Sequence, residues 1–301
     1  MLSDSEAIMR KAVAFARTSK PAYLELYDFL EKLFSAQLEA KKHLAVPFTA
    51  MDAASIHARW RSGRPLLRRW DFPVDIQAAE TVLKAVADAV PPHNRELSGA
   101  CSALAQALAR NPSAKDAVWE SFLHHEWNPW EEWVETTGVD LPSLLYVARS
   151  CLRPSVEWTA EELLKTASLN ETWKEGYCPV CGSLPALITL EGQGYRRAHC
   201  SWCGTPWRLA RFQCPVCDNR RHQSLGYLYA EEEPRYRIDY CAECRHYFKT
   251  VDTRELLWPI WIPLEEWTTL HLDLVAQRAQ WKTPPSPAPA VYEADTPAVP
   301  S

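Results

Sequence analysis

Apolar residues in the first 170 positions recur at the three- and four-residue spacing that is typical of amphipathic helices. The clearest stripe covers 23–38, and another covers 76–90 and ends at Pro91-Pro92, because proline cannot continue a helix. These stripes predict an all-helical, bundle-like domain over residues 1–170. The other expected helices are 6–18, one after Pro47, 97–110, a Trp-rich stretch over 117–134, and two separate helices at 141–152 and 159–167.

The helical spacing stops near residue 171, where glycine becomes more frequent and short β-prone runs appear. We expect strands at 186–190, 195–199, 207–212, 225–229 and 236–240. They divide into two small ribbons over 171–210 and 211–252. After them, an apolar strip and a helix at 264–279 predict that 253–282 packs on the helical domain. Residues 283–301 contain six prolines and few large apolar side chains, which predicts a disordered tail.

Eight of the ten cysteines lie in the ribbon region, as four Cys-x-x-Cys pairs. We call each pair with its turn a knuckle. Successive knuckles are separated by 18, 10 and 23 residues, and each of the two longer gaps has room for a β-hairpin. Adjacent pairing needs only local hairpins, so we prefer it to an interleaved arrangement. The predicted sites are Cys178, Cys181, Cys200 and Cys203 for the first metal, and Cys214, Cys217, Cys241 and Cys244 for the second.

Four thiolates arranged tetrahedrally suit zinc or iron, so two metal ions per chain are expected. In the first knuckle Pro179 fixes φ within the turn, and Gly182 supplies a positive φ directly after the second cysteine. Asp218 stands at the position equivalent to Gly182, and we expect some strain there. The alternatives are disulfides, which need an oxidising compartment, and buried free thiols, which would not recur in pairs. We expect the remaining Cys101 and Cys151 to be small core residues.

Composition narrows the choice of compartment and partner. The net charge is −5, and the N-terminus lacks the apolar core of a signal peptide. No run of 18 apolar residues is present. A reducing, cytoplasmic location is therefore expected, and nucleic acid is an unlikely partner. A zinc-ribbon nucleic-acid binder remains the alternative, because aromatic and basic residues of the ribbons could form a local patch. These residues are Trp202, Trp207, Arg208, Arg211, Arg220 and Arg221. The other interpretation is that Trp207 covers its metal hairpin and the arginines are solvated.

The sequence shows no nucleophile-plus-base motif and no phosphate-binding loop, and no catalytic residue is assigned. A catalytic metal keeps an open coordination position, whereas a four-thiolate site is closed. We therefore expect a protein that is not an enzyme. An iron-dependent redox protein is kept as a further alternative.

The order of the knuckles behind a helical domain resembles the formate dehydrogenase accessory proteins of the FdhE type. The resemblance is strongest over 176–252 and is looser upstream, at Gly63-x-Pro65-Leu66 and Arg153-Pro154. The residues that carry it are Tyr177 to Ser183 with Pro185, Arg197, Cys200, Cys203, Trp207, Arg211, Cys214, Pro215, Cys217, Cys241, Cys244, Tyr247 and Lys249.

This resemblance implies an α plus small β architecture in which two rubredoxin-like or zinc-ribbon modules follow the helical domain. It implies that all eight knuckle cysteines are metal ligands, with iron or zinc bound. It also implies a cytoplasmic maturation factor that binds the catalytic subunit of a respiratory formate dehydrogenase before export. The ribbons, with Trp202, Trp207, Arg208 and Arg211, are then the expected docking surface. Asp218 and Arg245 replace small residues, so the metal of the second site is left open between iron and zinc.

Overall fold

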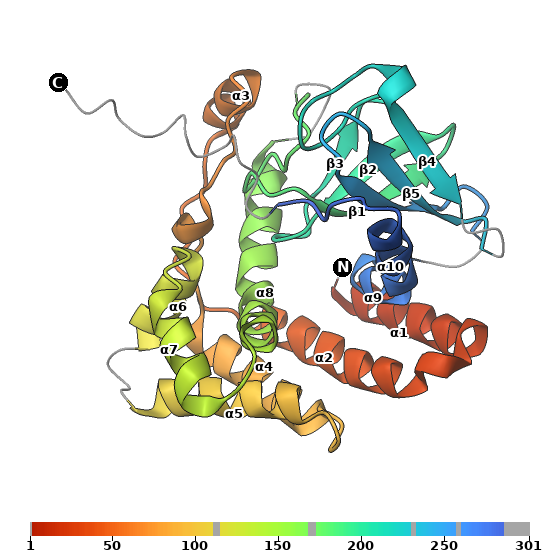
Figure 1. Ribbon diagram of the computed structural model, residues 1–301. Coiled ribbons are helices and arrows are strands. Elements are labelled where there is room, and N and C mark those ends of the chain that lie inside the picture. The colour runs from red at the N-terminus through yellow and green to blue at the C-terminus, as the bar shows by residue number, and fades with distance from the viewer. Residues whose placement is uncertain (1, 111–114, 168–172, 230–232, 257–259, 286–301) are drawn as a thin grey trace. The chain divides into compact units, whose positions relative to one another are not determined.

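The structure is a computed structural model that describes residues 2–110, 115–167, 173–229, 233–256 and 260–285 (Figure 1). The chain divides into two compact units. The first unit contains residues 1–49 and 69–159, and the second contains 50–68 and the residues from 160 onward. The first unit is helical and the second carries all the strands, so the α plus small β architecture is confirmed. No described helix is both long enough and apolar enough to cross a membrane.

The first unit is built from amphipathic helices whose apolar faces meet, as the spacing predicted. Helices α1 and α2 pack together, α2 packs on α4, and α4 packs on α5. Leu30, Val82 and Val86 are completely buried in the core of this unit. Asp75 caps α4, because its carboxylate accepts a hydrogen bond from Ala78 N at 2.9 Å. The helices of this unit are α1 (Leu2–Ser19), α2 (Leu24–Lys42), α4 (Ile76–Ala89), α5 (Arg95–Arg110), α6 (Lys115–Leu123), α7 (Asn128–Thr137) and most of α8 (Leu141–Thr166), with short 3-10 turns at Pro21–Tyr23 and Arg69–Asp71.

Helix α8 is continuous, and the expected break between 152 and 159 is wrong. Pro154 lies inside the helix, where it has no N–H to donate to the carbonyl of Ser150. That carbonyl instead accepts a hydrogen bond from Gln37 Nε2 on α2, at 2.9 Å. A buried side chain from a distant helix therefore replaces the missing backbone bond and allows the helix to continue.

The strands form one six-stranded sheet in the order β3-β2-β1-β6-β5-β4 (Figure 1). Each ribbon supplies three antiparallel strands, and parallel pairing of β1 with β6 joins the ribbons, with Ile188 opposite Thr250. The sequence did not predict β6, because Lys249 interrupts its apolar run. Lys249 Nζ is held by Asp273 Oδ2 at 2.8 Å and by the carbonyl of Glu266. The strands are β1 (Pro185–Glu191), β2 (Tyr195–Cys200), β3 (Pro206–Leu209), β4 (Leu225–Tyr229), β5 (Tyr236–Cys241) and β6 (Tyr247–Asp252), with a 3-10 turn at His222–Ser224.

Helices α9 (Ile262–Thr268) and α10 (Leu270–Arg278) accompany the sheet in the second unit, as does α3 (Ala53–Arg61). Leu272 and Ala276 of α10 are buried against Leu187, Ile238 and Val251 of the sheet. The single helix expected at 264–279 is wrong, because it breaks at Thr269, whose hydroxyl donates to the carbonyl of Glu265 at 2.5 Å.

Other expectations for the C-terminal part stay predictions. Part of the apolar strip, at 257–259, lies outside the described residues, as does the expected tail from 286 onward. Packing of 253–282 on the helical domain, and the expected domain boundaries, also stay predictions.

Candidate metal centres

All four knuckles have the same backbone hydrogen bond, which explains why each pair of cysteines faces inward. The N–H of the first cysteine donates to the carbonyl five residues later, at 2.8–3.0 Å in each case. The four pairs are Cys178 N to Ser183 O, Cys200 N to Thr205 O, Cys214 N to Asn219 O and Cys241 N to His246 O. The bond closes a tight loop around the two thiols, so both sulfur atoms point toward one centre.

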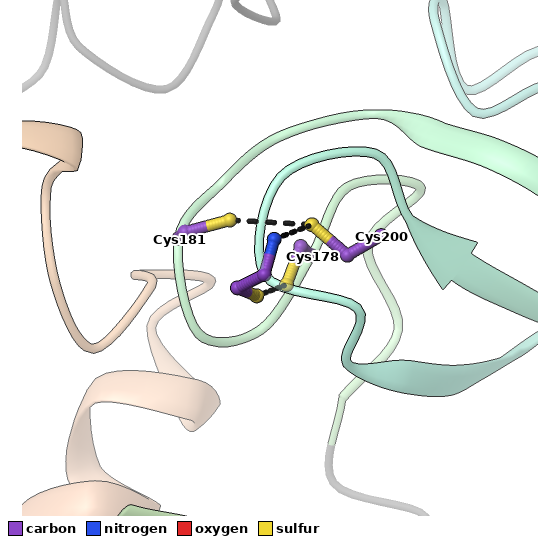
Figure 2. Close-up of side chains that lie close together, drawn as sticks. Cys178, Cys181 and Cys200 are labelled. Carbon is purple, nitrogen blue, oxygen red and sulfur yellow. Dashed lines mark hydrogen bonds between the residues drawn. The ribbon is translucent and has the colours of Figure 1, made fainter. Parts of the chain in front are cut away.

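The first cluster joins the first two knuckles, as the sequence predicted. Cys178 and Cys181 precede β1, whereas Cys200 ends β2 and Cys203 lies in the turn before β3. Figure 2 shows the sulfur atoms of Cys181 and Cys200 facing one another. The distance between them is 3.3 Å, and Cys178 Sγ lies 3.6 Å from Cys203 Sγ. All four side chains are buried.

The second cluster joins the last two knuckles. Cys214 Sγ lies 3.5 Å from Cys244 Sγ, and Cys217 Sγ lies 3.8 Å from Cys241 Sγ. Cys217 is exposed and Cys244 is partly exposed, whereas Cys214 and Cys241 are buried. The two clusters therefore have the same ligand types but differ in their access to solvent.

The donor sets fit a tetrahedral metal ion. Within each cluster all four sulfur atoms lie within 4.8 Å of one another. A metal–sulfur bond of about 2.3 Å in tetrahedral geometry places sulfur atoms about 3.8 Å apart, which is close to the distances observed. A disulfide needs about 2.05 Å, and all ten cysteines are free thiols. These clusters could each hold one ion; ligation itself stays a prediction.

Backbone and side-chain donors surround the sulfur atoms and favour the thiolate form. Val180 N lies 3.4 Å from Cys178 Sγ, and Trp202 N lies 3.3 Å from Cys200 Sγ. In the second cluster, Asn219 Nδ2 donates to Cys241 Sγ at 3.4 Å. Such bonds spread the negative charge that four thiolates bring to a metal.

Burial raises the pKa of the Cys178 and Cys203 thiols well above the ordinary value. Burial would also raise the pKa of Cys181, but its side-chain hydrogen bonds with Cys178, Cys200, Cys203 and Ser183 lower that pKa well below the ordinary value. A cluster without a cation therefore retains protons at neutral pH, and a metal ion has to displace them.

Other residues singled out from the sequence have plain structural roles. Cys101 and Cys151 are 2% and 1% exposed, as expected of core residues. Trp202 and Trp207 are 4% and 2% exposed, so neither side chain is available at a surface. Of the four residues expected to form a docking surface, only Arg208 and Arg211 are exposed.

A structural element that the sequence did not connect with the metal centres is the segment 50–68. Leu66 N donates to the carbonyl of Pro179 at 3.1 Å, and Leu67 N donates to that of Val180 at 2.8 Å. Trp60 Nε1 also donates to the carbonyl of Pro179. Tyr177 OH returns a bond to the carbonyl of Gly63 at 2.7 Å. The first knuckle is therefore held by a segment more than a hundred residues earlier in the chain.

Residues 177–211 match the central domain of the FdhE family. The chain is 34% identical over 146 residues to the FdhE homologue of Aquifex aeolicus, covering 46% of this chain and 50% of that protein. It is 36% identical over 77 residues to FdhE of Salmonella arizonae, covering 24% of each. The chain thus matches about half the length of the Aquifex aeolicus relative and about a quarter of the Salmonella arizonae relative.

The fold is similar to the crystal structure of the FdhE protein from Pseudomonas aeruginosa. The TM-score is 0.67 at 18% sequence identity, over 95% of this chain and 96% of that one. These findings confirm the resemblance to the FdhE family that the order of the four knuckles indicated.

Proposed function

We propose that this protein is a cytoplasmic accessory factor that binds the catalytic subunit of a formate dehydrogenase and assists its assembly before export. The observation that carries the proposal is the pair of four-cysteine clusters in one sheet, in a chain whose central region matches the FdhE central domain. The helical unit and the similarity of fold over nearly the whole chain support it.

In this proposal the metal ions hold the docking region in shape. Cys178, Cys181, Cys200 and Cys203 would hold one ion, and Cys214, Cys217, Cys241 and Cys244 the other. Iron or zinc with four thiolates would supply a closed, structural centre. A sheet of six short strands buries little apolar area by itself, so metal binding adds to its stability. This role requires no catalytic group.

The docking surface that we propose is the exposed surface around Arg208 and Arg211, where the first ribbon meets the second. Arg208 on β3 lies over the ring of Tyr195, 4.3 Å from its centroid, and Tyr195 is 49% exposed. Arginine and tyrosine are enriched at protein interfaces, because they combine apolar area with hydrogen-bond donors. Trp202 and Trp207 are buried, so they are not part of this surface.

Anaerobic co-purification under reducing conditions tests the proposal. The tagged protein should retain the formate dehydrogenase catalytic subunit, and Arg208→Glu/Arg211→Glu should reduce the retained subunit at least tenfold. Arg278→Glu reverses the charge of one exposed arginine on α10 and is the control for a charge reversal elsewhere in the second unit, with binding unchanged. Metal content is measured for each variant to show that the clusters are intact. A wild-type protein with both metals that retains no catalytic subunit would contradict the proposal.

A further inference from the structure

A cavity of about 290 Å³ lies beside the second cluster, entirely within the second unit. Strands β1, β2, β4, β5 and β6 contribute to its wall, as does the linker between the two ribbons. Its volume is at the lower end of the roughly 300–1,000 Å³ that is typical of small-molecule sites. The functions considered above involve this cavity only through Arg211, which belongs to the proposed docking surface and also lines the cavity.

Arginines dominate the charged lining. Arg196 and Arg237 share one carboxylate, that of Asp239: Arg196 Nη2 lies 3.5 Å from Asp239 Oδ2, and Arg237 Nε lies 2.7 Å from Oδ1. Arg211 also lines the cavity and forms no ion pair among the described residues. Three cations and one anion leave a net charge of +2 on these four side chains. A fourth lining arginine, Arg254, is paired with Asp252 at 2.5 Å.

Arg196 has a buried donor without a partner. Its side chain is 9% exposed, and its Nη1 donates to the carbonyls of Gln213 at 2.8 Å and Ala210 at 3.2 Å. Its buried Nε has no hydrogen-bond partner among the described residues. An unsatisfied buried donor is costly, and a ligand oxygen that accepts from it would remove that cost.

Aromatic rings complete the wall. Phe212 and Tyr227 are 47% and 56% exposed, so they lie at the open side of the cavity. The buried Phe248 also lines the cavity. The ring of Tyr240, by contrast, stacks on Trp281 with centroids 4.3 Å apart, on the face of β5 opposite to Arg237 and Asp239. The Tyr240 ring lies so close to β4 that a Cβ at position 226 would lie 2.4 Å from its Cζ, which explains Gly226. Flat apolar faces thus stand beside guanidinium groups.

We propose that this cavity binds a small organic anion that carries both a phosphate or carboxylate group and a flat ring. Guanidinium groups pair with the oxygens of either anion, and the aromatic rings contact the ring of the ligand. Because Cys214 and Cys241 also line the cavity, the ligand lies against the second cluster. This site shares Arg211 with the proposed docking surface, but no partner protein is needed to form it.

Calorimetric titration of the purified, metal-loaded full chain tests the proposal. AMP and benzoate are the phosphate and carboxylate probes, and adenosine is the neutral ring probe. We expect AMP or benzoate to bind with a Kd below 1 mM, and adenosine to bind at least tenfold more weakly than the preferred anion. The preferred probe identifies the anionic group. Failure of both anions to bind, or equal binding of adenosine, would overturn the proposal.

Two exposed arginines, each lying over an aromatic ring, provide the matched variants. Arg211→Gln removes a cation that lines the cavity and should weaken binding of the preferred anion at least tenfold. Arg208→Gln removes a nearby cation that does not line it and should change the Kd by less than twofold. Both positions are at the surface, so neither change should prevent folding. Equal weakening by the two variants would indicate nonspecific charge attraction and would overturn the assigned site.

Discussion

At the residue scale, the position after each second cysteine is held in the left-handed region. Gly182 and Gly204 have φ of 72° and 69° in the first cluster. Asp218 and Arg245 have φ of 51° and 64° in the second, where a side chain makes this conformation unfavourable by about 1–2 kcal/mol. The sequence predicted this turn for Gly182 and strain at Asp218. It could not predict the contacts that offset the strain, such as the Arg245 guanidinium over Trp281.

Comparison of Gly204→Ala with Arg245→Ala tests this difference between the two clusters. Gly204→Ala introduces a Cβ at positive φ and should lower the free energy of unfolding of the second unit by about 1–2 kcal/mol. Arg245→Ala keeps an L-residue there and should lose the contact with Trp281, about 0.5–1 kcal/mol. It also loses the exposed hydrogen bond from Arg245 Nη2 to the carbonyl of Gln280, for which water substitutes. The loss of thiolate-to-metal absorbance with increasing denaturant measures the free energy of unfolding of each variant. Equal losses would show that the backbone conformation does not control stability here.

At the element scale, the type of most helices and strands could be predicted from the sequence, but their ends and joints could not. Hydrophobic spacing predicts α2 and α4 because each buries one continuous apolar stripe. The continuity of α8 depends on Gln37, which is 113 residues from Ser150. The pairing of β1 with β6 likewise joins segments that are about sixty residues apart. Local patterns contain no information about such distant partners.

Removal of the Gln37 amide should destabilise the helical unit in a way that depends on Pro154. Gln37→Met keeps a side chain of similar volume and leaves the carbonyl of Ser150 without its donor, so unfolding should become easier by about 1–3 kcal/mol. Pro154→Ala supplies a backbone N–H to that carbonyl, so the same Gln37→Met change should have much less effect in that background.

A double-mutant cycle, with helix content followed by circular dichroism in urea, measures the coupling. Pro154→Ala alone is the control for the effect of proline itself. Additive effects of the two changes would show that Gln37 does not substitute for the missing N–H of Pro154.

At the scale of the whole molecule, one sheet carries two clusters that differ in exposure. The spacing of the knuckles predicted both groups of four cysteines, since ligand spacing is a local property. The exposure of Cys217 and the burial of Trp202 and Trp207 depend on packing of the sheet, which knuckle spacing does not determine. The Cys-x-x-Cys pattern that the two sites share therefore does not extend to their access to solvent.

Metal removal by a chelator should occur in two phases. The second site should release its ion faster, because Cys217 and Cys244 are accessible whereas all ligands of the first site are buried. Cys241→Ser should eliminate the fast phase and about one ion per chain, and Cys178→Ser should eliminate the slow phase. A colorimetric chelator assay follows the release. If either substitution removes both ions, the joined sheet makes the two sites a single folding unit.

The second unit also includes the segment 50–68, which would be missing from a fragment cut at the boundary expected from the sequence. A fragment of residues 171–285 loses the donors of Trp60, Leu66 and Leu67 and leaves the carbonyls of Pro179 and Val180 unpaired. The first knuckle should then open more easily, and its ion should be released at least tenfold faster than in the full chain.

Trp60→Phe in the full chain is the finer test, because it removes one hydrogen bond to Pro179 and keeps a large buried ring. It should speed release from the first site by about two- to tenfold, as expected for one hydrogen bond of about 0.5–1.5 kcal/mol. The second site serves as the internal control, since its knuckles form no bond with 50–68 among the described residues, and its release rate should not change. Equal acceleration at both sites would show that the substitution loosens the whole unit. An unchanged first site would show that the segment covers the knuckle without stabilising it.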